Sequence, residues 1–199
     1  MQKIKEIIIG TNNHGKYREI SNLLPNEIIK HSPEKLNINT PEETGKTFKD
    51  NSFIKASYFS KKTNLVCISD DSGLEIDLLN GNPGIYSSRW NNSKKNFNHG
   101  IKRIFKELNS IKNVWQNECI ARFVCSLTIY WPNGVNYSAQ GIVKGKISNI
   151  KKGKNGFGYD PIFIPDGYNQ TFGEMKPSVK MSLDHRHKAF LKIKKFFAQ

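Results

Sequence analysis

The sequence has few of the features that mark a secreted or membrane-embedded protein. It contains no run of roughly 18 apolar residues, the length from which a transmembrane helix is inferred, so we expect no such helix. The apolar stretch at residues 4–10 is too short for a signal peptide, is interrupted by Glu6, and is not followed by a small-residue cleavage site. We therefore expect a cytoplasmic protein without a membrane partner.

Cysteine is also scarce, and its positions exclude a disulfide framework. Cys67, Cys119 and Cys125 are odd in number and form no CxxC pair. The five histidines lack metal-ligand spacing as well, so a zinc site is not expected. With no export signal, the thiols are expected to be reduced and to serve as small core residues.

Acidic residues are few, with 17 Asp and Glu against 31 Lys and Arg, and the net charge is +14. Such a charge is compatible with a polyanionic partner, either a nucleic acid or a nucleotide phosphate. The lysines are spread along the sequence, which favours a compositional bias with most of them on solvated faces. The adjacent acids Glu42-Glu43 and Asp70-Asp71 are unusual here, because like charges repel unless a cation is bound. A surface loop would explain either pair alone.

Enough apolar material is present for a core, at 37% hydrophobic and 11% aromatic residues, and 199 residues fit a single domain over residues 1–199. Apolar β-branched runs indicate strands, and segments of helical periodicity indicate helices. Thr47 is a suitable helix N-cap, and Trp131-Pro132-Asn133-Gly134 predicts a β-hairpin. The expected strands are residues 3–10, 27–31, 65–69, 118–130 and 135–147, and the expected helices are residues 16–24, 47–62, 97–108 and a last one from near Asp184.

A strand–loop–helix is predicted near the start of the chain, where residues 10–16 read Gly-Thr-Asn-Asn-His-Gly-Lys. Backbone N–H groups and the positive end of a helix dipole attract anions, and Lys16 would add a full charge, so the loop suits a phosphate. It is not a Walker A loop, because Tyr17 follows the lysine where serine or threonine is required. An ordinary structural turn is the alternative.

The first acidic pair is a candidate metal site. Residues 42–48, Glu-Glu-Thr-Gly-Lys-Thr-Phe, precede a predicted helix on which Asn51 and Lys55 share a face. Carboxylates in such a loop could hold Mg²⁺, which accepts one or two carboxylates together with waters and phosphate oxygens. A solvated acidic loop is the alternative.

The second acidic pair, Asp70-Asp71, follows a predicted buried strand, and ligands gather at the carboxyl ends of strands in open α/β sheets. One acid could coordinate a metal and position or deprotonate water while the other tunes it. Ser72 and the amide of Gly73 could donate to phosphate. Arg89 could bind a phosphate bidentately or form a structural ion pair.

Two further segments carry candidate base-binding groups. Phe157 lies between Gly156 and Gly158, an aromatic face with little steric cover that suits stacking on a base, or else covers the core. Asp160 could accept from a base-edge N–H. Residues 180–186, Lys-Met-Ser-Leu-Asp-His-Arg, could present donors to a base carbonyl or a phosphate, or form an exposed basic helix terminus.

In this order and at these spacings, the five segments resemble the inosine triphosphate pyrophosphatase-like family, also described as dITP/XTP pyrophosphatases. The resemblance runs from Thr11 to Ala189. It implies an elongated α/β fold with a mixed central sheet flanked by helices, a substrate cleft between two lobes, and a homodimer. The implied reaction hydrolyses purine nucleoside triphosphates such as ITP, dITP and XTP to the monophosphate and pyrophosphate. The most specific motifs are residues 11–16, 43–48, 70–74 and 157–161.

The resemblance also implies residue roles. Asp71 would be the base that activates water and would bind Mg²⁺ together with Glu43, with Glu42 as an alternative ligand. The family's last motif reads Ser-His-Arg, whereas Asp184 precedes His185 here and adds charge at that point. The implied substrate-binding residues are Thr11, Asn12, Asn13, His14, Gly15, Lys16, Lys55, Ser72, Phe157, Gly158, Tyr159, Asp160, Lys180, His185 and Arg186.

Two other functions are compatible with the sequence. A basic nucleic-acid-binding protein without turnover would explain the charge of +14, but the paired acids would repel a phosphate backbone, so no stable nucleic-acid partner is expected. A pyrophosphatase for a pyrimidine or another modified nucleotide would share all the motifs.

Overall fold

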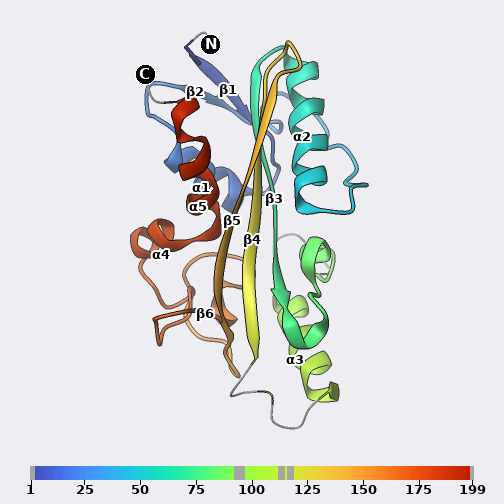
Figure 1. Cartoon of the computed structure of the whole chain (residues 1–199), viewed down its shortest axis with the longest axis vertical. Helices are drawn as coiled ribbons and strands as arrows, with labels where there is room; N and C mark the ends of the chain where they lie inside the picture. Colours follow the sequence, from blue (N-terminus) through green and yellow to red (C-terminus); the bar gives the residue numbers. More distant parts are fainter. Residues whose placement is uncertain (1–2, 92–96, 112–114, 116–118, 198–199) are drawn as a thin grey trace. The chain divides into compact units, whose positions relative to one another are not determined.

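A computed structural model of the chain describes residues 3–91, 97–111, 115 and 119–197 (Figure 1). It contains a six-stranded mixed sheet in the order β2-β1-β3-β4-β5-β6. Strand β1 is parallel to β2 and β3, and β5 is antiparallel to β6. The predicted mixed α/β fold is therefore confirmed. The strands are β1 Glu6–Ile9, β2 Ile29–His31, β3 Val66–Ile76, β4 Ile120–Tyr130, β5 Asn136–Ile147 and β6 Phe163–Pro165.

Five α-helices lie in the described part of the chain, four of them close to the predicted positions. Thr47 caps α2 as expected, and the capping box is completed by Asp50, whose carboxylate accepts from the Thr47 N–H. A short helix beginning at Pro177 was not predicted; proline at the first helical turn favours such a start. The helices are α1 His14–Leu23, α2 Phe48–Thr63, α3 Asn98–Ile111, α4 Pro177–Leu183 and α5 His185–Ile193.

The chain forms two compact units, each assembled from separate segments. The first unit comprises Met1–Asp71, Cys125–Gly141 and His185–Gln199, and the second comprises Ser72–Val124 and Ile142–Asp184. No helix among the described residues is long and apolar enough to cross a membrane.

The first unit is layered because β1 is apolar on both faces. Ile7 and Ile9 pack in one cluster with residues of α1 and α5, while Ile8 packs in another with Ala56 and Phe59 of α2. Since successive side chains of a strand point to opposite faces, α1 and α5 cover one face and α2 covers the other (Figure 1).

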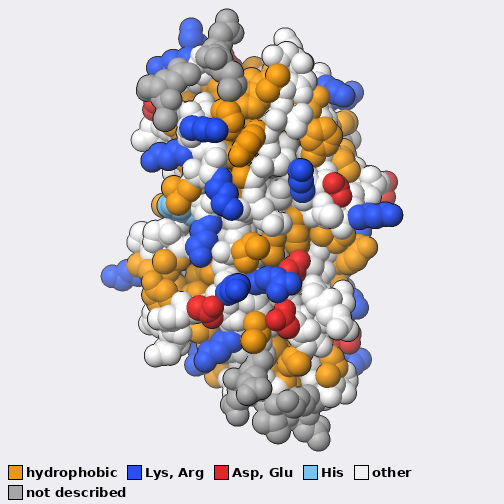
Figure 2. Space-filling model, viewed as in Figure 1, with side chains coloured by type: hydrophobic (Ala, Val, Ile, Leu, Met, Phe, Trp, Pro, Cys, Tyr) orange, Lys and Arg blue, Asp and Glu red, His pale blue; other side chains and the backbone are white. Residues whose placement is uncertain are grey.

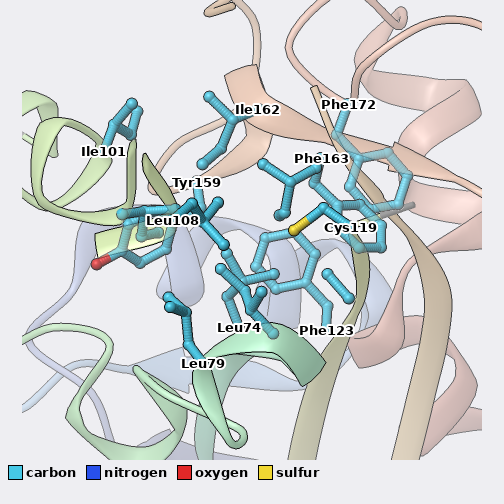
Figure 3. Packing of buried hydrophobic residues seen from close by; sticks show 14 of the residues in the cluster. Leu74, Leu79, Ile101, Leu108, Cys119, Phe123, Tyr159, Ile162, Phe163 and Phe172 are labelled. Carbon is cyan, nitrogen blue, oxygen red and sulfur yellow. The ribbon is translucent and has the colours of Figure 1, made fainter. Parts of the chain in front are cut away.

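The second unit has its own core (Figure 3). The helix predicted at residues 97–108 packs here as α3, with Ile101, Ile104 and Leu108 buried in this cluster and Phe97, just before the helix, partly buried against it. Aromatic rings fill the centre: the Phe163 ring lies 4.7 Å from that of Phe123 and 5.3 Å from that of Phe172, between centroids. Such pairs add to the free energy gained from burial alone.

One strand prediction is wrong in a way that matters for the site. The strand expected at residues 65–69 continues to Ile76, so Asp70 and Asp71 lie within β3 and not after its carboxyl end. Ser72-Gly73 has the composition of a turn, but Gly73 lies within the strand, where another segment of the chain approaches it closely. A Cβ on Gly73 would overlap the carbonyl oxygen of Gly84 and the hydroxyl of Ser87, so the glycine allows the segment from Gly84 to Ser87 to pack on the strand.

Other local predictions hold. The hairpin between β4 and β5 is closed by Gly134 N–H donating to the Trp131 carbonyl at 2.9 Å, with Gly134 at φ +90°. Cys67, Cys119 and Cys125 are buried, as expected. Helix α1 begins at His14, two residues before the expected start. Glu118, the expected first residue of β4, lies outside the described residues.

Candidate functional site

Asp70 and Asp71 point to opposite faces of β3, and this gives the two neighbouring acids different surroundings. Asp70 faces the α1 and α5 side and is fully buried. Its Oδ2 lies 3.2 Å from Lys16 Nζ and 3.0 Å from an Arg186 guanidinium nitrogen. Burial alone would raise the pKa of Asp70, but Lys16 and Arg186 hold it well below its usual range. Asp70 is therefore a permanent carboxylate.

Asp71 faces α2 and has the opposite tendency. Its Oδ2 accepts a hydrogen bond from Asn51 Nδ2 at 3.1 Å, and its Oδ1 lies 3.7 Å from Lys55 Nζ. Burial raises the pKa of Asp71, and the carboxylates of Glu43 and Asp70 add to this against the effect of the lysines. A raised pKa gives this carboxylate a greater affinity for a proton, which is the property of a general base.

Lys55 and Glu43 complete the group around Asp71. Lys55 is 4% exposed, and its ammonium donates to Glu43 Oε1. Burial would lower the pKa of Lys55, yet Asp71 and Glu43 raise it overall, so the ammonium stays charged. Burial would raise the pKa of Glu43, but the charge and hydrogen bond of Lys55 lower it overall. Glu42 is exposed, so Glu43 is the acid of this loop that reaches Asp71's surroundings.

The residues that could hold a metal are Glu43 and Asp71. In the described part of the chain no group of three or more His, Cys, Asp or Glu is arranged to hold an ion. Two carboxylates that converge on one ammonium nevertheless suit Mg²⁺, which keeps several waters and binds phosphate oxygens in place of a full protein cage. The donor set therefore fits this ion.

The loop at residues 10–16 has the predicted strand–loop–helix form. Asn13 caps α1, its Oδ1 accepting from Lys16 N–H at 3.0 Å, and its own N–H donates to Thr11 Oγ1 at 3.2 Å. Asn12 Nδ2 donates to Thr40 Oγ1, and His14 is exposed. The cap orders the loop so that Lys16 reaches Asp70, while Gly15 lies in the first turn of the helix.

Arg186 has an environment that the sequence did not predict. It is 1% exposed, and its guanidinium binds Asp70 and Glu19, a residue of α1 one turn after Lys16. The resemblance implies that Arg186 contacts the base or the sugar-phosphate. In the structure its guanidinium forms ion pairs with Asp70 and Glu19, both in the first unit. The preceding His185 is also buried, at the start of α5.

Three of the base-binding candidates, Phe157, Asp160 and Lys180, lie in the second unit. Asp160 Oδ2 accepts from the Phe157 N–H at 2.8 Å and from Lys180 Nζ at 2.6 Å. The Lys180 ammonium lies 5.0 Å from the centroid of the Phe157 ring. Gly156 and Gly158 both have positive φ, which lets the chain turn sharply on either side of Phe157. Three predicted residues are thus brought together.

The family of the chain follows from comparison with known proteins: the model of the Ham1 family matches residues 7–196. The chain belongs to the Ham1 family. It is 39% identical over 189 residues to a dITP/XTP pyrophosphatase of Rhodospirillum centenum, covering 94% of this chain and 92% of that protein. It is likewise 39% identical to a dITP/XTP pyrophosphatase of Bartonella quintana, with 94% and 92% covered. The structure of a HAM1 protein from Coxiella burnetii matches with a TM-score of 0.84 at 32% identity, covering 96% of both chains.

Within this Ham1-family chain, other predicted residues have structural partners. Tyr159 is buried, and its hydroxyl donates to the Ser87 carbonyl at 2.8 Å, which anchors the loop that carries Phe157. Ser72 is half-buried in β3. Sequence reasoning missed Glu19 and gave no role to Asn51, although the spacing of four between Asn51 and Lys55 was a usable signal.

Proposed function

We propose that this protein is a nucleoside-triphosphate pyrophosphatase that hydrolyses aberrant purine nucleotides, ITP, dITP and XTP, to the monophosphate and pyrophosphate, and so cleanses the nucleotide pool. The observation that carries the proposal is Asp71, a buried carboxylate of raised pKa beside the ammonium of Lys55. Family membership and the names of the relatives support the choice of substrate.

In the proposed reaction Asp71 accepts a proton from water while the water oxygen forms a bond to the α-phosphorus. The bond between the α-phosphorus and the bridging oxygen breaks, and pyrophosphate leaves with its electron pair. Lys16 and Lys55 stabilise the phosphate charge, since phosphoryl transfer depends mainly on positioning and electrostatics. Asp70 keeps Lys16 oriented through their ion pair.

We propose Mg²⁺ as the cofactor, held by Glu43 and Asp71. When bound, it neutralises phosphate charge and orients the triphosphate. As the resemblance implies, the first loop would present its amides and side chains to the same phosphates, through Thr11, Asn12, Asn13, His14 and Gly15. Ser72 would touch the substrate.

Base recognition would depend on Phe157 and Lys180. Phe157 would stack on the purine, and Lys180, oriented by Asp160, would donate to an oxo group of the base. An amino group at the same position would leave a buried donor without its acceptor, at a cost of about 1–3 kcal/mol. This would favour ITP and XTP over ATP. Gly158, Tyr159, His185 and Arg186 remain predicted members of the substrate site.

The test is incubation with ITP and Mg²⁺, with pyrophosphate and orthophosphate assayed separately. We expect pyrophosphate and inosine monophosphate as the primary products, whereas orthophosphate as the primary product would contradict the proposal. A panel of purine and pyrimidine triphosphates distinguishes a pyrophosphatase for another modified nucleotide. The substrate cleft and the homodimer that the resemblance implies remain proposals, as does the cytoplasmic location, and gel filtration tests the dimer.

The nucleic-acid-binding alternative predicts steeply salt-dependent binding of DNA or RNA and no turnover. Lys and Arg side chains are scattered over the face shown in Figure 2 among hydrophobic, acidic and uncharged ones, which on this face favours solvated lysines over a nucleic-acid-binding block. Stable nucleic-acid binding at physiological salt without ITP hydrolysis would support that alternative instead.

A further inference from the structure

Asn51 is a fully buried polar residue whose side-chain amide bridges two segments of the proposed metal site. The Gly45 N–H donates to Asn51 Oδ1 at 2.8 Å, and Asn51 Nδ2 donates to Asp71 Oδ2 at 3.1 Å. Its exposure is 0%; the hydrogen bond to Asp71 is buried, and that from Gly45 is part-buried. A buried polar side chain is stable only when its groups are satisfied, and Asn51 satisfies them on Gly45 and Asp71.

The orientation of this amide follows from its partners. A backbone N–H can only donate, so the Asn51 oxygen must face Gly45. The amide nitrogen is then directed to Asp71, whose ionised carboxylate can only accept. Asn51 thus joins the loop that carries Glu43 to the strand that carries Asp71 in one defined arrangement.

Lys55 makes the same connection one helical turn later. Its ammonium contacts Glu43 Oε1 and lies 3.7 Å from Asp71 Oδ1, so residues 51 and 55 each link the acidic loop to Asp71. The two links differ in charge. The positive charge of Lys55 offsets the negative charge of Glu43 and Asp71, which a bound cation needs. The neutral Asn51 links the same two segments and leaves that negative charge unchanged.

The helix that presents Asn51 is held firmly. The next residue, Ser52, hydrogen-bonds through its hydroxyl to Thr128 Oγ1 at 2.8 Å and to Ser126 Oγ at 3.2 Å, both on β4. The loop partner is equally constrained, because a Cβ on Gly45 would lie only 2.7 Å from Asn51 Oδ1. A glycine is needed there for the loop to approach Asn51.

We propose that Asn51 is a positioning residue that holds the Glu43 loop and Asp71 in register, so that both carboxylates face one divalent cation. The inference rests on the proposed metal-dependent function. Asn51 acts through Asp71 and the Glu43 loop and does not itself touch the substrate.

The experiment compares wild type with Asn51→Leu, which keeps the side-chain size and removes both hydrogen bonds. Calorimetric titration with Mn²⁺, used as a probe without nucleotide, is expected to show affinity reduced about 10- to 100-fold, the effect of losing a partner that orients a metal ligand. With ITP at saturating Mg²⁺, kcat should fall while KM for ITP stays near the wild-type value. Ser60→Ala is the control, because it removes a part-buried hydrogen bond from another residue of the same helix, to the Leu65 carbonyl.

Asn51→Ser provides a second variant if leucine opposite the Asp71 carboxylate prevents folding, which near-ultraviolet circular dichroism reports. Gly45→Ala completes a double-mutant cycle: since it disturbs the same link, its effect on Mn²⁺ affinity should not add to that of the Asn51 variant. Additive effects, or unchanged Mn²⁺ affinity and kcat in a folded Asn51 variant, would overturn the positioning role. Equal losses in Ser60→Ala would overturn it too. Absence of Mg²⁺-dependent pyrophosphate release in wild type would instead contradict the proposed function itself.

Discussion

At the scale of single residues, two adjacent carboxylates acquire opposite chemistry from the faces of one strand. Asp70 lies among Lys16 and Arg186, which keep it ionised, and Asp71 lies in a buried position where its pKa is raised. Successive side chains of a strand point to opposite faces, so two neighbouring residues contact different helices and can have different roles. Asp70 therefore organises cations, and Asp71 is available for a proton.

Asp71→Asn is expected to leave the fold intact and to lower kcat for ITP hydrolysis by about 10²- to 10⁴-fold, the usual contribution of a positioned general base. The amide keeps the size of the side chain but cannot accept a proton from water. The rate is measured as pyrophosphate release. Asp166→Asn, a change at an exposed acid, serves as the control and should retain the wild-type rate; full activity in Asp71→Asn would mean that another group is the base.

Asp70→Asn is expected to reduce the free energy of unfolding at pH 7 by about 3–5 kcal/mol, because it breaks a buried ion pair and leaves Arg186 and Lys16 without a carboxylate they contact. The pKa of Asp70 is lowered by folding, so its stabilisation is present above pH 3.8, the ordinary aspartate value, and is lost as pH falls below it.

Urea unfolding of both proteins at pH 7 and pH 3 measures this. The difference between wild type and Asp70→Asn should shrink at the lower pH. A difference that is the same at both values would show that the Asp70 charge does not contribute to stability.

At the scale of elements, β3 and α2 together build the proposed catalytic group. Asp70 and Asp71 lie in the middle of strand β3. Helix α2 places Asn51 and Lys55 one turn apart on the face that contacts Asp71. Secondary-structure elements hold side chains more precisely than loops do, which suits a site that works by positioning. Only Glu43 comes from a loop, and that loop is tied to α2 through Gly45.

Gly73→Ala is expected to destabilise the protein by about 1–3 kcal/mol, the range for forcing extra atoms into a well-packed region. The new methyl group would overlap the Gly84 carbonyl oxygen, and a backbone atom cannot move aside as a flexible side chain can. Thermal and urea unfolding measure the loss. Lys102→Ala, at an exposed position of α3, is the control and should change stability very little.

At the scale of the whole molecule, each compact unit has a hydrophobic core of its own, and the charged groups of the proposed site are paired with protein partners. Glu43 and Asp71 contact Lys55, and Asp70 contacts Lys16 and Arg186. The fold is therefore stabilised by apolar burial and internal ion pairs, which need no metal.

Removal of divalent metal with EDTA is accordingly expected to stop pyrophosphate release while the free energy of unfolding stays close to its original value. Activity should return when Mg²⁺ is added in excess of the chelator. This behaviour differs from that of a structural metal, whose removal unfolds the protein. Urea unfolding with and without EDTA tests it, and unfolding by EDTA alone would assign the metal a structural role.

The sequence by itself determined the parts that depend on neighbouring residues. Local hydrogen bonds and periodicity decide the cap at Thr47, the hairpin at Asn133-Gly134 and the apolar face of α3, so local patterns predict them. The order of the motifs can be read directly from the sequence. The mixed α/β fold and the family were predicted from the resemblance that these motifs carry, and both are confirmed.

Tertiary structure alone decided which groups meet. Arg186 reaches Asp70 across 116 positions, and Glu19 joins them from α1, so no local pattern could assign Arg186 to this ion pair. Strand β3 continues through Asp70 and Asp71 to Ile76, and the chain at Gly84 packs closely against its Gly73. The proposed role of Asn51 depends on a loop and a strand that meet only in the folded chain. Such contacts arise from packing between distant segments, whose free energy is not encoded in any short stretch of sequence.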